Sequence, residues 1–181
     1  MAYLESPPID ARTNGVNRAT PEGHGAAFRL AMREFANGVA LVSAVHGDKK
    51  SGCTATSLCS LSLEPPSLIV CIERGSATLA VIRSAGGFGV SIVGAAHEAL
   101  ADRFAGRTGL KGAARFAGAD WMTLATGAPL LTDALASMDC KVEEILDRHT
   151  HAIVIGRVLA VRRDADGPAL LHWRGRFQPL G

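Results

Sequence analysis

The sequence lacks the motifs by which most nucleotide-binding and hydrolytic enzymes are identified. No G-x-x-x-x-G-K-[ST] segment occurs, and Gly86-Gly87-Phe88-Gly89 lacks the G-x-G-x-x-G spacing and precedes a strand-like segment rather than a helix. These absences argue against a P-loop and a Rossmann domain. A G-x-S-x-G nucleophile elbow is also missing, so a serine hydrolase is not indicated. A phosphate-bearing ligand must therefore be held by hydroxyls, backbone amides and Arg or Lys on another scaffold.

Metal-binding and redox motifs are scarce as well. The four cysteines lack Cys-x-x-Cys spacing and lie in apolar or alternating surroundings, as expected of small core residues in a reducing cytoplasm; they are Cys53, Cys59, Cys71 and Cys140. His149 and His151 form a His-x-His pair, but no third ligand follows at a recognisable spacing. We therefore expect a cytoplasmic protein without a metal site.

Long apolar runs, aromatics and net charge are also limited. No apolar stretch approaches the roughly 18–20 residues that cross a bilayer, and no N-terminal basic-then-apolar signal is present, so no membrane association is expected. Aromatic residues make up 5% of the chain and the net charge is +2, which does not predict nucleic-acid binding. The 48% hydrophobic content instead predicts a continuous core and an apolar surface covered in a homodimer.

Apolar periodicity predicts one mainly β domain over residues 26–181, preceded by a flexible arm over residues 1–25. Helices are predicted over 26–36, from a Ser76 cap to Ile82, and over 95–104. Strands are predicted over 39–45, 67–73, 88–93, 134–146, 151–162 and 170–177, with a hairpin turn over 46–52 and a long mobile connection over 106–118. Because β-α-β alternation is absent, these elements predict a closed or nearly closed antiparallel barrel with flanking helices.

The segment from Gly52 to Ser62 is rich in hydroxyls and contains no charge. Thr54, Thr56, Ser57, Ser60 and Ser62 supply short hydrogen-bonding groups, and the small Ala55 side chain permits close approach of a flat ring. The composition is equally typical of a strand with ordinary Ser and Thr pairing. The residues alone leave both interpretations open.

Several motifs together resemble the flavin reductase family, whose members have an FMN-binding split barrel of Greek-key type. The resemblance runs from about Phe28 to Leu180. Within the family, the sequence is similar to the reductases that serve 4-hydroxyphenylacetate hydroxylation and pyrimidine-ring degradation. Its markers are Phe28-Arg29-x-Ala31-Met32-x-x-Phe35-x-x-Gly38-Val39, Gly52-x-Thr54-Ala55-Thr56-Ser57-x-x-Ser60-x-Ser62, Pro65-Pro66, Arg74-Gly75-Ser76-x-Thr78, Phe104-Ala105-Gly106, His151-x-Ile153-x-x-Gly156-x-Val158 and Leu170-Leu171-x-Trp173-x-Gly175-x-Phe177.

The resemblance implies a set of cofactor-binding residues. The flavin ribityl chain, phosphate and ring edge would be held by Thr54, Ala55, Thr56, Ser57 and Ser60. The phosphate side would also be contacted by Arg74, Ser76 and Thr78, and the nicotinamide site would be bordered by His151, Gly175, Arg176 and Phe177. The family often has Tyr where Phe177 stands, so a role that depends on that hydroxyl is lost here.

The implied reaction is hydride transfer from the nicotinamide C4 of NADH or NADPH to N5 of FMN or FAD, without a side-chain nucleophile. Reduced flavin would then leave for a partner flavin-dependent monooxygenase. Two alternatives stay open at this point. The protein would either retain FMN and pass electrons to a protein partner, or be a non-catalytic flavin-binding or haem-binding barrel.

Overall fold

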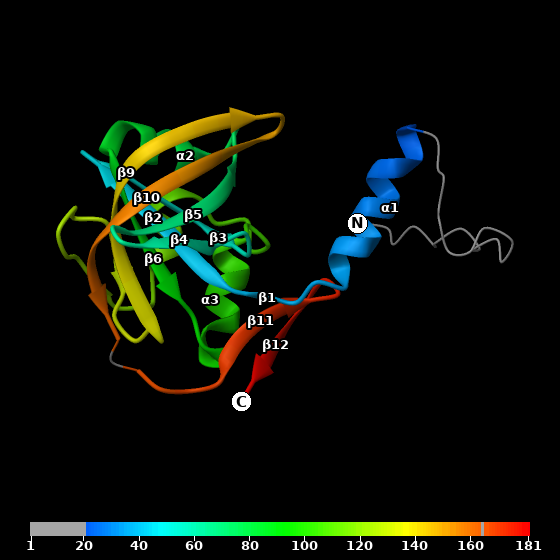
Figure 1. Ribbon diagram of the computed structural model, residues 1–181. Coiled ribbons are helices and arrows are strands. Elements are labelled where there is room, and N and C mark those ends of the chain that lie inside the picture. The colour runs from blue at the N-terminus through cyan, green and yellow to red at the C-terminus, as the bar shows by residue number, and fades with distance from the viewer. Residues whose placement is uncertain (1–20, 164) are drawn as a thin grey trace, which may run out of the picture.

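The computed structural model describes residues 21–163 and 165–181, and its centre is a seven-stranded antiparallel sheet that curls into a barrel (Figure 1). The strands follow the order β3-β2-β6-β9-β10-β5-β4. Their bounds are β2 Ala40–His46, β3 Lys49–Ala55, β4 Cys59–Leu63, β5 Pro66–Glu73, β6 Gly87–Ile92, β9 Ala136–Arg148 and β10 His151–Arg162. Because β3 and β4 are the two edges of this sheet, the barrel is split between them. The antiparallel split-barrel prediction is confirmed.

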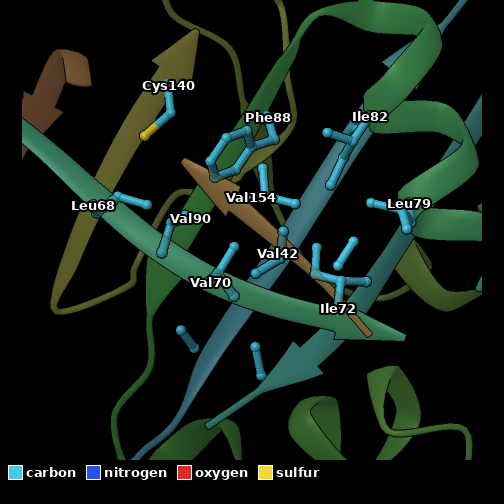
Figure 2. Close-up of a cluster of buried hydrophobic side chains, with 14 of the residues drawn as sticks. Val42, Leu68, Val70, Ile72, Leu79, Ile82, Phe88, Val90, Cys140 and Val154 are labelled. Atoms are coloured by element: carbon cyan, nitrogen blue, oxygen red, sulfur yellow. The ribbon is translucent and has the colours of Figure 1, made fainter. Parts of the chain in front are cut away.

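The barrel interior is filled by alternating apolar side chains, shown in Figure 2. β5 contributes Leu68, Val70 and Ile72, which lie at every second position and are each 3% exposed or less. Phe88 of β6 is fully buried, and a Cβ atom at Gly156 of β10 would lie 2.4 Å from its Cζ atom. Glycine at position 156 therefore makes room for the Phe88 ring.

Helix α2, Ala77–Ala85, packs its apolar face onto this core through Leu79 and Ile82. The Ser76 side chain accepts a hydrogen bond from Leu79 N at 3.2 Å, so the predicted N-cap is confirmed. The helix ends at Gly86, whose φ of 67° is left-handed and favours glycine.

A second core lies on the other face of β2. It joins Leu41 of that strand to Phe104 at the end of α3, Glu98–Phe104, which follows a 3₁₀ turn, η1, Ala95–His97. Since both faces of β2 are covered, its run of five buried residues from Ala40 to Ala44 is explained.

Segment 106–118, predicted as a long mobile connection, is exposed over residues 106–111 and is buried only at Phe116, so its mobility stays a prediction. It contains the 3₁₀ turn η2, Gly112–Phe116, and Phe116 is 5% exposed. The Phe116 ring lies 4.9 Å from Phe104 and 4.7 Å from Trp121, measured between ring centroids. These aromatic contacts hold Phe116 in the second core. The short strands β7, Trp121–Met122, and β8, Leu130–Leu131, follow it.

The C-terminal segment is a hairpin rather than the single strand predicted over 170–177. Strands β11, Ala169–Trp173, and β12, Arg176–Leu180, are joined by Arg174 and Gly175, whose φ angles are 50° and 82°. A turn with two positive φ angles matches the twist of antiparallel strands. β1, Asn37–Gly38, adds a third strand next to β11. The turn between β2 and β3 is likewise shorter than predicted, because β3 already begins at Lys49.

Helix α1, Pro21–Arg33, begins earlier and ends earlier than the predicted helix over 26–36. Of the predicted arm, residues 1–20 lie outside the described residues, and residues 21–25 belong to α1. Arg174 pairs with Glu34 just beyond the helix, with its Nη2 atom 2.6 Å from Glu34 Oε2, and α1 extends away from the barrel in Figure 1. No helix among the described residues is long and apolar enough to cross a membrane.

Candidate functional site

A pocket of about 860 Å³ lies beside the free edge of β3, in the split of the barrel. This volume is within the range of small-molecule sites, about 300–1,000 Å³. The lining residues come from α1, β3 and the turn after it, the end of β5, the start of α2, the end of α3, η2 and the start of β10. They are Phe28, Met32, Cys53, Thr54, Ala55, Thr56, Ser57, Cys71, Ile72, Glu73, Ser76, Phe104, Ala105, Arg115 and His151.

Six of the twelve predicted binding residues line this pocket. They are Thr54, Ala55, Thr56, Ser57, Ser76 and His151. The other six are not among its lining residues; they are Ser60, Arg74, Thr78, Gly175, Arg176 and Phe177. The roles assigned to all twelve stay predictions.

Two hydroxyls of the Gly52–Ser62 segment hold the fold itself. Ser57 Oγ donates to Cys71 O at 2.9 Å and accepts from Cys71 N at 3.1 Å, so one side chain pairs with β5 much as a strand residue would. Thr54 Oγ1 donates to Ala101 O of α3 at 2.6 Å. Together these bonds fasten the turn after β3 to both sides of the pocket.

Thr56 differs from these two neighbours. Its side chain is half-buried and lines the pocket, and its hydroxyl has no hydrogen-bond partner among residues 21–163 and 165–181. A partly buried hydroxyl without a protein partner is available to a ligand. Thr56 is therefore the hydroxyl of the segment best placed to bind one.

The predicted phosphate-side residues have partners of their own. Thr78 is 2% exposed, and its hydroxyl lies 3.1 Å from Ser51 Oγ inside the barrel. Arg74 Nη1 donates to His149 O at 3.1 Å, and its Nε atom lies 3.8 Å from Asp147 Oδ1. Arg74 is thus held by the β9–β10 turn, while Ser76 both caps α2 and lines the pocket.

The predicted tail residues lie at the C-terminal hairpin. The guanidinium of Arg107 lies 5.1 Å from the centroid of the Phe177 ring, and the His172 ring meets Phe177 edge-on at 5.5 Å. Burial, together with the Arg107 charge, lowers the pKa of His172. Phe177 therefore packs with Arg107 and His172 beside the second core rather than in the pocket lining.

Sequence reasoning missed Arg115, which donates to three backbone carbonyls. Its Nε atom lies 2.9 Å from Leu110 O, and its Nη1 atom lies 2.8 Å from Gly52 O and 3.1 Å from Phe104 O. The adjacent Phe116, the one aromatic residue of the glycine-rich segment 106–118, was the signal that this part of the segment packs against the barrel.

Cys53 lines the pocket, but its thiol is not activated for nucleophilic attack. Burial raises the pKa of Cys53 to about 11, and the hydrogen bond with Thr78 and the Arg115 charge oppose this rise only in part. Among the described residues no group of three His, Cys, Asp or Glu side chains could hold a metal ion. The arrangement offers a hydroxyl, a guanidinium, the Glu73 carboxylate, the exposed His151 imidazole and apolar walls, which can bind and orient a ligand.

Comparison with known proteins agrees with this geometry. The flavin reductase like domain matches residues 32–181. "FMN reductase (NADH) RutF" of Agrobacterium fabrum is 35% identical over 161 residues, covering 89% of this chain and 91% of that protein. "FMN reductase (NADH) RutF 2" of Methylorubrum extorquens is 42% identical over 157 residues, covering 85% and 88%.

Solved structures share the fold. BorF, the flavin reductase component of a bacterial two-component tryptophan halogenase, is 33% identical with a TM-score of 0.79, covering 86% of this chain and 98% of that one. The NADH:FAD oxidoreductase SgcE6 of Streptomyces globisporus, in complex with NAD and FAD fragments, is 26% identical with a TM-score of 0.80, covering 92% and 98%. Domain match, sequence identity and coverage together place the chain: it belongs to the flavin reductase family.

Proposed function

We propose that this protein transfers hydride from NADH to FMN and supplies reduced FMN to a partner flavin-dependent monooxygenase. The observation that carries the proposal is the pocket at the split of the barrel, with the Thr56 hydroxyl available and the Arg115 guanidinium anchored at its side. The choice of FMN and NADH is supported by the relatives that are named FMN reductase (NADH).

The residues present fit a flavin. Ala55 is 6% exposed, and its single methyl leaves space at the wall where a flat ring would lie. Phe104 and Ile72 add apolar surface, and Thr56 adds one polar contact. Sites with mainly apolar walls and a few placed polar groups are typical for such ligands.

Bound flavin and nicotinamide carry the redox chemistry themselves, by hydride transfer from C4 to N5. The chain's own contribution is to hold the two rings against each other and to exclude competing reactions. Thr54 and Ser57 fix the turn that bears Thr56, while the raised pKa of Cys53 keeps that thiol protonated at neutral pH. The exposed His151, at the start of β10, lies at the rim where nicotinamide would enter.

A steady-state comparison of four cofactor pairs tests the proposal. Purified protein is mixed with NADH or NADPH and with FMN or FAD, and oxidation is followed at 340 nm. Turnover that is fastest with NADH and FMN is expected. No flavin-dependent oxidation with any pair refutes the proposal, and faster turnover with NADPH or FAD corrects the cofactor. Copurified yellow colour with slow exchange would favour a flavoprotein that retains FMN.

His151→Ala tests the nicotinamide side of the pocket. The His151 side chain is exposed, and its Nδ1 atom lies 2.9 Å from the Thr150 hydroxyl. The apparent KM for NADH should rise more than the apparent KM for FMN. Thr150→Ala, which removes only the neighbouring hydroxyl, is the matched control. A larger effect on the KM for FMN would assign His151 to the flavin instead.

The homodimer prediction is supported by α1. Phe28 is 68% exposed, Met32 is 45% exposed, and Phe35 just beyond the helix is 61% exposed. Such an apolar surface is typical of a subunit interface. A dimer that covers it would also enclose the pocket, because Phe28 and Met32 line it. Light scattering should give twice the monomer mass, and Phe35→Glu should lower the dimer fraction.

Two further proposals concern cellular context. The described residues contain four free cysteines, which is consistent with a reducing cytoplasm. The partner is proposed to be a monooxygenase because reduced flavin reacts with oxygen, and a second enzyme must use that product. Coupled hydroxylation with a candidate monooxygenase, compared with the same assay without the reductase, tests this partnership.

A further inference from the structure

Arg115 is the only Arg or Lys among the described residues that line the pocket. Its three hydrogen-bonded partners are backbone carbonyls, which leave the positive charge uncompensated by a carboxylate. No ion pair joins Arg115 to any acidic side chain in the part of the chain that the structure describes. The pocket lining therefore contains one guanidinium, that of Arg115, and one carboxylate, that of Glu73, and no ion pair joins them.

The Arg115 guanidinium is anchored by hydrogen bonds, but one of its nitrogen atoms still has donors without an acceptor. Nε and Nη1 make the three bonds to Leu110, Gly52 and Phe104, while Nη2 has no acceptor among the described residues. Nη2 lies against Gly106, where a Cβ atom would be only 3.2 Å away. Because the φ of Gly106 is +82°, this position favours glycine, which leaves the guanidinium undisturbed.

The positive charge of Arg115 acts on another residue that lines the pocket. The Arg115 charge opposes the burial that raises the pKa of Cys53, so it acts on an atom of another lining residue. Arg115 approaches the pocket from the α3 and η2 side, whereas the start of α2 approaches it through Ser76. If the flavin phosphate lay at the start of α2, where an anion is favoured, the Arg115 side of the pocket would face the ring.

Hydride transfer creates a charge that this side must accommodate. The C4–H bond of the nicotinamide breaks with its electron pair, a bond to flavin N5 forms, and a neutral isoalloxazine ring gains one negative charge as the nicotinamide becomes a cation. We propose that Arg115 stabilises the negative charge of the reduced flavin ring through its free Nη2 group and its uncompensated charge. The inference rests on the proposed flavin site, and it identifies a binding residue whose effect depends on redox state.

Equilibrium binding measures this dependence without turnover. The dissociation constants of oxidised FMN and of anaerobic, dithionite-reduced FMN are measured for the wild type and for Arg115→Met. A charge-assisted hydrogen bond lost only with the reduced form should raise the Kd of reduced FMN about 10-fold or more relative to that of oxidised FMN. The same measurement with riboflavin, which lacks the phosphate, should show the same redox dependence.

Arg103→Met is the matched control. Arg103 Nη1 donates to Ala117 O, so it also anchors segment 106–118, but it does not line the pocket. Its ratio of the two dissociation constants should equal that of the wild type. Arg115→Gln, which retains an amide donor without the charge, replaces Arg115→Met if that variant unfolds.

Each alternative gives a different result. If Arg115→Met loses equal affinity for oxidised and reduced FMN, the inference is overturned. If that equal loss is seen with FMN but not with riboflavin, Arg115 is assigned to the phosphate. An unchanged ratio for Arg115→Met, or the same change in Arg103→Met, also overturns it. A wild-type protein that binds neither FMN nor riboflavin refutes the proposed flavin site itself, which is a separate outcome.

Discussion

Thr56 and Ser57 are adjacent in the chain, but their hydroxyls have different roles in the structure. Single substitutions can separate the contribution of Ser57 to stability from the proposed contribution of Thr56 to ligand binding. Ser57→Ala removes two hydrogen bonds to Cys71, each contributing about 0.5–1.5 kcal/mol. Because Ser57 is exposed, water can bond to the Cys71 backbone groups in place of the lost hydroxyl. The free energy of unfolding should therefore fall by about 1–2 kcal/mol. For a domain of this size that corresponds to a Tm decrease of roughly 2–8 °C.

Thr56→Val should leave the Tm unchanged, because the Thr56 hydroxyl has no partner among the described residues. If that hydroxyl binds flavin, the variant loses one neutral hydrogen bond in the complex. The Kd for FMN should then rise about 2- to 10-fold. Val preserves the branched shape at Cβ, so the pocket wall is retained.

Thermal unfolding followed by circular dichroism without flavin, and FMN titration followed by flavin fluorescence, measure the two quantities separately. Ser60→Ala is the control, because Ser60 is exposed and does not line the pocket. A Tm decrease in Thr56→Val, or an unchanged Tm in Ser57→Ala, would refute the division of roles. A loss of FMN affinity in Ser60→Ala would instead support the contact implied by the family resemblance.

Two further predictions concern the barrel and the C-terminal hairpin. Gly156→Ala should cost about 1–3 kcal/mol of unfolding free energy because its methyl would overlap the Phe88 ring, whereas Gly38→Ala, with open space around it, should be near neutral in the same urea titration. The lowered pKa of His172 means that the folded state binds its proton less readily than the unfolded state does, so its contribution to stability is present above about pH 6.5 and is lost as the pH falls below that value. His172→Gln should flatten this part of the stability–pH curve, and an unchanged slope would contradict the assignment.

Strands β5 and β10 and the capped helix were predictable because their signals are local, whereas β3 and β4 were not predicted as strands. β5 alternates buried positions at Leu68, Val70 and Ile72, and β10 begins and ends at the predicted residues. Ser76 starts α2 through a bond to a residue three positions away, which a sequence pattern can reveal. These elements need little information from the rest of the chain.

Segment 106–118 and the C-terminal hairpin were not predictable in the same way. The packing of the first depends on Arg115 reaching Gly52, 63 residues earlier, and its glycines are equally typical of a loose loop. The second turns at Arg174 with a φ of 50°, a conformation that sequence patterns expect of Gly or Asn. The Arg115 contact is tertiary and the positive φ at Arg174 departs from the residue's preference, so neither follows from a local pattern.

The binding segment shows the same limit at the level of single residues. A run of uncharged Ser and Thr indicates a polar wall, but the use of each hydroxyl depends on what the fold brings beside it. The Thr54 hydroxyl donates a hydrogen bond to Ala101, 47 positions away, and the Ser57 hydroxyl donates one to Cys71, 14 positions away. The Thr56 hydroxyl has no hydrogen-bond partner among the described residues. Since a hydroxyl that is hydrogen-bonded to the backbone keeps the turn in place, the proposed flavin contact at Thr56 depends on the hydrogen bonds of its two neighbours. Substitution at Thr54 or Ser57 should therefore weaken flavin binding through the loss of turn geometry, and only substitution at Thr56 should weaken it without a loss of stability.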